Sequence, residues 1–239
     1  MSPRPHPTIG IIGGFGPMTS ARFCCSVVKQ AHALKSNCSP AFMMDSVAIP
    51  HATATAFIRG SVEAGMEHAR AIHRASQRLA LAGVRTIAIP CNTVHLFEDH
   101  FDLPTGVSLL HIIDATLRQL QEQRCVRMGL LATTMTVRSG VYQRRCEAAG
   151  IECVIPPPRL QRDLSNLIAE FVRSGTVTPQ VVDLFMAVND HFSRHGAEVI
   201  VLGCTDIGGM LSQAEITHAI PVLDSLELLA KEVALASLL

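Results

Sequence analysis

Short, continuous apolar runs alternate with longer amphipathic segments along almost the whole sequence. The runs "TIGIIGG", "FMMDSVAIP" and "TIAIP" each end in Gly or Pro, and helix-length segments separate them. In one such segment, Ser61 can cap a helix that Gly83 ends, and Ala69 and Ile72 share its apolar face. Strands that are apolar throughout and alternate with helices are typical of a parallel sheet covered on both faces. The sequence therefore predicts an α/β protein.

This pattern restarts near the middle of the chain. "TIGIIGGFGPMT" and "RMGLLATTMTVR", 119 positions apart, each read as a strand followed by a turn of small residues. "TIAIPCNTVHLF" and "VIVLGCTDIGGML" each place a cysteine where an apolar run stops, and these cysteines are 113 positions apart. A degenerate duplication of one α/β unit explains why the two pairs of stretches have nearly the same separation. We expect two pseudosymmetric domains, each a mostly parallel sheet flanked by helices, formed by residues 1–106 plus 225–239 and by residues 107–224.

The charge and the apolar pattern limit the partners of the chain. Lys plus Arg equals Asp plus Glu, at 20 each, so no broad electrostatic footprint for nucleic acid is expected. A chain with no Trp and one Tyr also offers few stacking platforms for bases. No apolar run is long enough to span a membrane, and "MSPRPHPT" lacks the apolar region of a signal peptide. We expect a cytoplasmic protein.

Eight cysteines would be mostly reduced in that compartment. The sequence contains no CxxC pair, which argues against the usual zinc-ribbon and thioredoxin motifs. His95 follows Cys91 by four residues, but C-x3-H without a second pair is a weak metal signal, so no metal site is expected. His95 is expected as a capped or core histidine, with a proton-tuning role as the lesser alternative. Six cysteines are expected to be small packing residues: Cys24, Cys25, Cys38, Cys125, Cys146 and Cys153.

A ligand site is expected beyond the carboxyl ends of the strands, where open parallel sheets bind their ligands. The turns 13–18 and 132–136 and the two cysteines should all lie at those ends. Two facing domains would then enclose one cleft with a cysteine on each wall. The turn that contains Phe15 lacks the spacing of a dinucleotide fingerprint. It can bring backbone N–H groups close to an anion, and a tight turn without a ligand is the equal alternative.

Each of these cysteines is expected just before a helix. The positive end of a helix dipole should favour the thiolate and lower the thiol pKa. Asn92, Thr93 and Thr205 add donors suited to a carboxylate, although Asn and Thr also commonly cap helices. Asp206 could tune the second thiol or serve as an acidic residue at a helix N-terminus.

The stretches "IGIIGGFGP", "PCNTVH", "LLATTMTVRSGVY" and "GCTDI" resemble, in order and spacing, the cofactor-independent aspartate/glutamate racemase family, in its aspartate racemase branch. The resemblance covers nearly the whole chain. It implies two α/β domains with the site between them, an amino-acid substrate, no cofactor and usually a homodimer. It also implies that one cysteine thiolate removes the α-proton while the other thiol returns a proton to the opposite face.

The same resemblance suggests roles for individual residues. Cys91 and Cys204 match the catalytic pair. Arg162, in "LQRDL", falls where the family often has a basic ligand for the side-chain carboxylate of the substrate. The residues matching those that hold the α-carboxylate or amine, or that form a wall of the same pocket, are Asn92, Thr93, Thr205, Thr133, Thr134 and Thr136.

Two departures from the family pattern leave the amino acid open. Ala52 stands where the family commonly has an arginine, and loss of that bidentate fork would weaken recognition of aspartate or glutamate. Asp206 stands where the family often has glutamate. A hydantoin racemase, a maleate isomerase or an arylmalonate decarboxylase of the same superfamily therefore remains an alternative. A non-catalytic small-molecule binder is an alternative of a different class.

Overall fold

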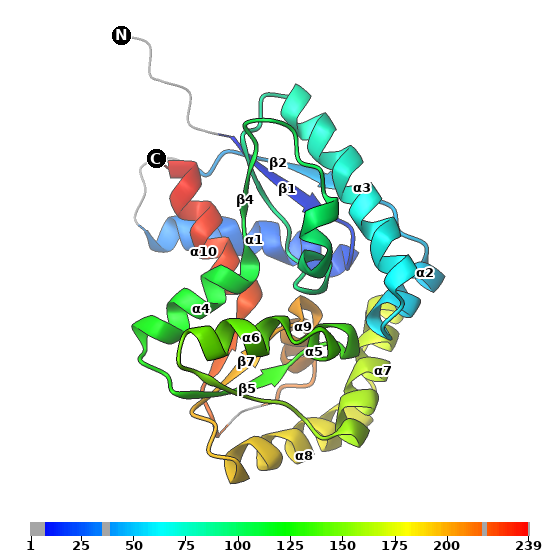
Figure 1. Ribbon diagram of the computed structural model, residues 1–239, viewed down its shortest axis with the longest axis vertical. Helices are drawn as coiled ribbons and strands as arrows, with labels where there is room; N and C mark the ends of the chain where they lie inside the picture. Colours follow the sequence, from blue (N-terminus) through cyan, green and yellow to red (C-terminus); the bar gives the residue numbers. More distant parts are fainter. Residues whose placement is uncertain (1–7, 35–38, 217–218, 239) are drawn as a thin grey trace.

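The computed structural model describes residues 8–34, 39–216 and 219–238. Cys38, expected as a packing residue, lies outside these ranges. Two parallel four-stranded sheets, one in each half of the molecule, are flanked by helices (Figure 1). This arrangement confirms the predicted α/β class.

The two sheets have the same topology. The first has the strand order β2-β1-β3-β4 and the second β6-β5-β7-β8, and every neighbouring pair is parallel. Each sheet thus places its strands in the order second, first, third, fourth, as the predicted duplication requires. The first sheet consists of β1 (Ile9–Gly13), β2 (Phe42–Ser46), β3 (Thr86–Ala88) and β4 (Ser108–Leu110). The second consists of β5 (Arg127–Leu131), β6 (Glu152–Val154), β7 (Val199–Leu202) and β8 (Val222–Asp224).

The central strands are buried because helices cover both faces of each sheet. All five residues of β1 and all four of β7 are buried, as expected for continuous apolar strands in a parallel sheet. In register, Ile9 of β1 lies opposite Phe42 of β2 and Thr86 of β3. The carboxyl ends of the central strands therefore lie at one edge of each sheet.

Helices connect the strands throughout. Ser61 caps α3 by accepting a hydrogen bond from the Ala64 N–H, and Gly83 follows the helix with a φ of +92°, as predicted. The helices are α1 (Pro17–Ala33), α2 (His51–Ile58), α3 (Val62–Leu81), the 3-10 helix η1 (Thr93–His100), α4 (Ile112–Glu122), α5 (Thr134–Ser139), α6 (Val141–Ala148), α7 (Pro158–Ser174), α8 (Gln180–Arg194), α9 (Thr205–Gln213) and α10 (Ser225–Leu238).

Helix α10 follows the second sheet but packs against α1 and α4 (Figure 1). Its buried face includes Leu226, Leu229 and Val233, which belong to a core cluster with residues of both sheets. Strand β4 pairs with β3 in the first sheet. The expected first domain consisted of residues 1–106 plus 225–239, which leaves β4 outside it. The division of the chain into two domains remains a prediction, and the strand pairing favours a limit after Leu110.

Helix α2 was not predicted from the sequence. Its segment "HATATAFI" alternates Thr with Ala, and no side chain caps its start, so the local signal for a helix is weak. It packs against α3 of its own half and against α5 and α7 of the other half. Residues 139–149, whose sequence predicts a helix that Gly150 ends, contain α6, which begins at Val141 because Gly140 takes a φ of +69° and separates it from α5.

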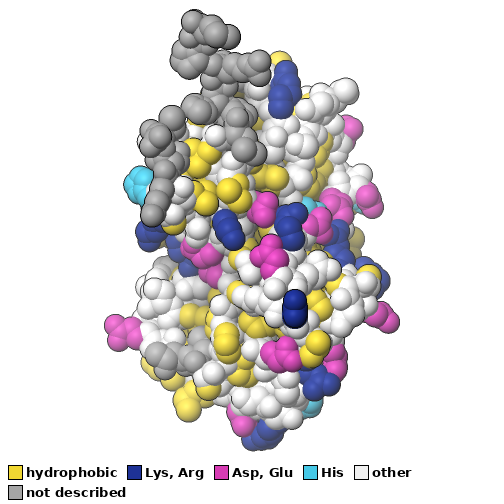
Figure 2. Space-filling model, turned by 90° about the vertical axis from the view of Figure 1, so that its left-hand side faces the viewer, with side chains coloured by type: hydrophobic (Ala, Val, Ile, Leu, Met, Phe, Trp, Pro, Cys, Tyr) yellow, Lys and Arg dark blue, Asp and Glu magenta, His cyan; other side chains and the backbone are white. Residues whose placement is uncertain are grey.

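The surface carries charges of both signs. On the face drawn in Figure 2, basic and acidic side chains lie intermingled around the middle of the molecule, in keeping with a formal net charge of zero. Among the residues that the structure describes, no helix is long and apolar enough to cross a membrane.

Candidate active site

The two paired cysteines lie at equivalent places in the two halves. Cys91 comes just after β3, and Cys204 just after β7, and these are the third strands of their sheets. Cys204 is the N-cap residue of α9, while Asn92, which follows Cys91, is the N-cap residue of η1. The prediction that each cysteine precedes a helix is confirmed.

The backbone around the two thiols is arranged alike. In each case the backbone groups of the second and third residues after the cysteine act to lower the thiol pKa. These residues are Thr93 and Val94 for Cys91, and Asp206 and Ile207 for Cys204. The start of the following helix thus has the same effect on both thiols.

Both thiols line one small cavity. Of the other predicted site residues, Phe15 and Thr93 line it from the first half, and Thr133 and Asp206 line it from the second. Its free space is about 20 Å³, which holds about one water molecule. The geometry therefore agrees with the prediction that one cysteine from each half lines a shared site. The cavity is too small to hold an amino acid.

The expectation that helix N-termini lower the thiol pKa values is wrong. Burial raises the pKa of Cys91 to about 12, although part of its surface is accessible. Burial also raises the pKa of Cys204, which is 6% exposed, well above its ordinary value. The nearby carboxylate of Asp206 adds to both shifts, and the backbone N–H groups only partly offset them. Both thiols are therefore protonated at neutral pH.

The Asp206 carboxylate is held beside Cys204. The Cys204 thiol donates a weak hydrogen bond to Asp206 Oδ2 at 3.9 Å, and the Thr19 hydroxyl donates to Oδ1 at 2.5 Å. A Cβ atom on Gly16 would lie 2.6 Å from Oδ1, so only glycine leaves room for the carboxylate there. Burial raises the pKa of Asp206. The geometry is that of a base placed to accept the Cys204 proton.

Thr205 links the two halves. Its hydroxyl donates to the carbonyl oxygen of Pro90 at 3.0 Å, directly before Cys91 in the chain. Its own carbonyl accepts a hydrogen bond from Arg22 at 2.5 Å, and Arg22 also lies 3.7 Å from Asp224. The Thr205 side chain thus holds the cysteine segments together rather than lining the cavity.

Asn92 has a similar linking position. Its side-chain N–H donates to the Ser225 hydroxyl at 2.9 Å, and its Oδ1 accepts from the Tyr142 hydroxyl at 2.6 Å. Ser225 in turn donates to the carbonyl of Leu202 at 2.6 Å. Asn92 is 1% exposed, so its amide joins η1 to α6 and α10 behind the cavity.

Three threonine hydroxyls form a triangle between the halves. Thr93 Oγ1 lies 3.1 Å from Thr133 Oγ1 and 3.0 Å from Thr136 Oγ1, and the last two are 3.1 Å apart. Thr93 comes from η1, whereas Thr133 caps α5 and Thr136 lies within it. Thr93 and Thr133 also line the cavity, and Thr136 supports them from a fully buried position.

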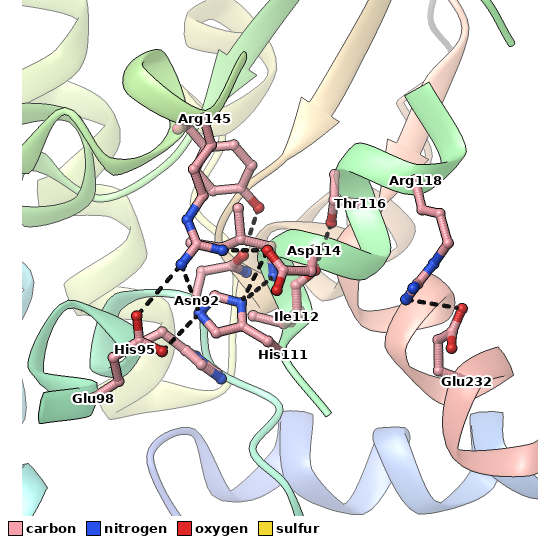
Figure 3. A network of polar contacts seen from close by, with 12 residues as sticks. Asn92, His95, Glu98, His111, Ile112, Asp114, Thr116, Arg118, Arg145 and Glu232 are labelled. Carbon is pink, nitrogen blue, oxygen red and sulfur yellow. Dashed lines mark hydrogen bonds and ion pairs between the residues drawn. The ribbon is translucent and has the colours of Figure 1, made fainter. Parts of the chain in front are cut away.

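His95 faces away from the cavity. Its Nδ1 lies 2.8 Å from the carbonyl oxygen of Cys91, and its ring is 4.4 Å from that of His111. Figure 3 shows this pair beside Glu98 and Arg145, which bridge η1, α4 and α6. Burial, together with His111, lowers the pKa of His95 to about 3, so it remains neutral and supports the Cys91 backbone.

The family model of Asp/Glu/hydantoin racemases matches residues 12–233 of this sequence. The chain belongs to the Asp/Glu/hydantoin racemase family. The family predicted from the sequence motifs is thereby confirmed, and with it the enzyme class of a racemase, which is an isomerase.

Relatives of this racemase match it over nearly its full length. The broad specificity amino-acid racemase RacX of Bacillus subtilis is 27% identical over 227 residues, covering 93% of this chain and 95% of RacX. A candidate Asp/Glu racemase from Yersinia pestis has a TM-score of 0.79 and 25% identity, covering 98% of this chain and 100% of its own. The aspartate racemase of Picrophilus torridus shares the fold, with a TM-score of 0.75 and 23% identity over 97% of this chain and 94% of its own.

Arg162 does not reach the cysteine cavity of this racemase. It lines a separate cleft of about 570 Å³, together with Arg59 and Arg138. Ala52, at the position where the family commonly has arginine, is exposed on the first turn of α2. The structure therefore brings neither position to the thiols.

Five cavity residues were missed by the sequence reasoning. His68 shares the apolar face of α3 with Ala69 and Ile72, a spacing that could have drawn attention to it. The residues of α2 could not be found because that helix was not predicted. The missed residues are Ala54, Phe57, Ile58, His68 and Ile168.

Metal-ligating side chains do not converge in the part of the chain that the structure describes. Within residues 8–34, 39–216 and 219–238, no group of three or more His, Cys, Asp or Glu side chains could hold a metal ion. The chemistry of the cavity residues is that of proton transfer, with two thiols and one carboxylate.

Proposed function

We propose that this protein is a cofactor-independent amino-acid racemase of the aspartate/glutamate type, in which Cys91 and Cys204 invert the α-carbon by two-base proton transfer. One observation supports this most strongly. Two thiols, each just after the third strand of its sheet and just before a helix, line the same cavity. Inversion requires an acid–base group on each face of the α-carbon, and two groups of the same kind suit both directions.

In the proposed reaction, one cysteine as thiolate takes the α-proton from its face of the substrate. The electron pair left on the α-carbon delocalises into the α-carboxylate. The other cysteine then gives its thiol proton to the opposite face, and the two sulfurs have exchanged protonation states. For one enantiomer Cys91 is the base, and for the other it is Cys204.

Formation of the first thiolate needs help, because burial keeps both thiols protonated. We assign Asp206 as the group that accepts the Cys204 proton, since its Oδ2 is already 3.9 Å from the sulfur. The positive ammonium group of a bound amino acid would then stabilise the thiolate. Binding and activation of the thiol are thereby coupled.

The α-carboxylate needs hydrogen-bond donors in order to stabilise the developing charge. Thr93 and Thr133 have hydroxyls at the cavity. Phe15, which also lines the cavity, belongs to the glycine turn whose backbone N–H groups are predicted to approach an anion. Asn92, Thr136 and Thr205 act as positioning residues, because their side chains join the walls. His95 positions Cys91 through its carbonyl.

The cavity must open to admit an amino acid, since its free space is only about 20 Å³. Helix α2 belongs to the first half but packs on α5 and α7 of the second, and it supplies three lining residues. We propose that α2 moves away from α7 when substrate enters and closes over it afterwards. Closure would exclude water from the reacting groups.

The test is incubation with a panel of amino acids in heavy water, with deuterium incorporation and chiral composition measured together. We expect inversion with uptake of solvent deuterium. Cys91→Ser and Cys204→Ser should each abolish inversion, while Cys25→Ser, at an exposed cysteine, should not. Full activity in either of the first two variants would refute the two-thiol mechanism.

A hydantoin racemase is the second candidate, because the cavity wall on the α2 side is largely apolar and the family description includes hydantoins. The same panel should also contain hydantoins, maleate and arylmalonates. Turnover of one of these compounds, and not of amino acids, would indicate a hydantoin racemase, a maleate isomerase or an arylmalonate decarboxylase. A non-catalytic binder would incorporate no deuterium into any of these compounds.

We further propose a cytoplasmic location and a homodimer. Seven cysteines within the described residues are free, which suits a reducing compartment. The dimer is inferred from the family resemblance. Light scattering coupled to size-exclusion chromatography tests the dimer, and fractionation of the native host tests the location.

A further inference from the structure

The cavity wall formed by α2, α3 and α7 is apolar, with a single polar side chain. Ala54, Phe57 and Ile58 come from α2, and Ile168 comes from α7. The one polar member is His68 of α3. Among the described residues that line this cavity, none is Lys or Arg.

The orientation of His68 is well defined. Its Nδ1 lies 2.6 Å from the carbonyl oxygen of Ala64, and because a carbonyl can only accept, Nδ1 is the protonated nitrogen. Its ring stacks on Phe57 with centroids 4.2 Å apart and lies 5.5 Å from Phe15. Nε2 forms no hydrogen bond within the described chain, which leaves one acceptor for a ligand in the cavity.

The charge of this wall disfavours an acidic side chain. Burial lowers the pKa of His68, which is 1% exposed, so the imidazole is neutral at pH 7. Asp206 is the one carboxyl group among the described residues that line the cavity. Arg22 acts on Asp206 from outside the cavity, and no Lys or Arg among the described lining residues would face the side-chain carboxylate of an acidic substrate, so its burial there is costly.

The three arginines of the neighbouring cleft do not line the cysteine cavity. Ile58 and Thr133 line the cysteine cavity, whereas the residues that follow them, Arg59 and Thr134, line the cleft with Arg162. The guanidinium groups therefore do not face the thiols.

We propose that this wall is the subsite for the substrate side chain, and that it selects neutral amino acids whose hydroxyl or amide donates a hydrogen bond to His68 Nε2. The inference rests on the racemase function proposed above and specifies its substrate class. His68 is thus a specificity-determining residue, and the α2 residues set the size of the side chain.

Two nearly isosteric pairs of substrates test the charge and the donor separately. Asparagine and aspartate differ in the charge of the side chain, and threonine and valine differ in the presence of the hydroxyl. From deuterium exchange at the α-carbon in heavy water, we expect kcat/KM to be at least about tenfold higher for asparagine and for threonine than for their partners, which is about 1.4 kcal/mol. A preference for aspartate over asparagine would overturn the inference.

Variants at His68 test the residue itself. His68→Phe preserves the stacking on Phe57 but removes the acceptor, so it should lower kcat/KM for threonine about tenfold and leave valine unchanged. His68→Gln restores an acceptor near the position of Nε2 and should recover much of the loss. His73→Phe, on the same helix but bonded to the Asp102 carbonyl, is the matched control. Equal losses for threonine and valine in His68→Phe would reject the specificity role.

A binding measurement separates this inference from the racemase proposal. Asparagine should raise the Tm more than aspartate does at the same concentration, whether or not exchange occurs. A larger shift with asparagine but no exchange would refute the racemase function and support the subsite. A larger shift with aspartate, lost in Arg162→Gln, would refute the subsite and assign Arg162 as the side-chain ligand. No shift and no exchange with any amino acid would refute both.

Discussion

The Thr205 hydroxyl donates a hydrogen bond to the carbonyl oxygen of Pro90 at 3.0 Å, across the boundary between the two halves. Pro90 and Thr205 are each next to a cysteine of the pair, and they are 115 positions apart in the chain. This buried hydrogen bond thus joins the two segments that hold the thiols.

Thr205→Val should separate these segments. It leaves the Pro90 carbonyl without its donor, and an unpaired buried acceptor costs about 1–3 kcal/mol. We expect a lower midpoint of urea unfolding with an unchanged m-value, together with a lower kcat. Thr205→Ser keeps the hydroxyl and should behave nearly as wild type, so equal stability of the Val variant would contradict the role assigned to this bond.

Gly16→Ala should destabilise the protein through one contact. Gly16 has an extended backbone with φ −148°, which any residue adopts, so only the clash of the new Cβ with Asp206 Oδ1 matters. Overpacking of this kind costs on the order of 1–3 kcal/mol. In an Asp206→Ala background the same substitution should cost much less. Equal costs in both backgrounds, measured by urea unfolding, would show that the carboxylate is not the obstacle.

Tyr142→Phe should weaken the junction behind Cys91. The lost hydroxyl leaves Asn92 Oδ1 buried without its donor, at a cost of about 1–3 kcal/mol. The measurement is chemical denaturation of the single variants and of Tyr142→Phe combined with Asn92→Ala. The double variant should lose less than the sum of the two singles; strict additivity would indicate that the bond contributes nothing.

His95 should make the protein sensitive to acid. Its pKa is lowered from 6.5 to about 3 by burial, followed by the effect of His111. Below pH 6.5 His95 binds a proton in the unfolded chain but stays neutral in the native protein. The stability that depends on neutral His95 is therefore complete above pH 6.5 and is lost as the pH falls toward 3.

The matched variant for this prediction is His95→Asn, which retains a donor at the position of Nδ1. Between pH 7 and pH 4 it should lose less stability than wild type, by on the order of 3 kcal/mol. Urea unfolding across that range measures the difference. Parallel pH curves for the two proteins would contradict a buried neutral histidine.

The raised thiol pKa values predict slow alkylation at neutral pH. Labelling of Cys91 by iodoacetamide should rise steadily as the pH increases toward 12, with the exposed Cys25 as an internal reference. Asp206→Asn removes a charge that raises the pKa of Cys91, and should speed its labelling at fixed pH by up to about tenfold. Labelling that saturates near pH 7 would instead support a stabilised thiolate.

Local features of the sequence predicted the two repeated α/β units and the placement of both thiols at strand ends. Continuous apolar runs specify buried parallel strands by themselves, and a cysteine at a strand end must lie at the carboxyl edge of its sheet. Helix α2 was missed because its alternation of Thr and Ala has neither a cap nor a helical period. Its packing on α3 and α7 stabilises it instead.

What the sequence determined is therefore the fold, the family and the positions of the two cysteines at strand ends, because these depend on motifs a few residues long. Only the tertiary structure decided the direction of the thiol pKa shifts, since burial and Asp206 act on Cys91 across both halves. Likewise, the polar groups of Asn92 and Thr205 bond to Ser225 and Pro90, which are distant in the chain. The local sequence could not predict that Asn92 and Thr205 join the two halves. Desolvation and hydrogen-bond partners depend on which surfaces meet when the chain folds.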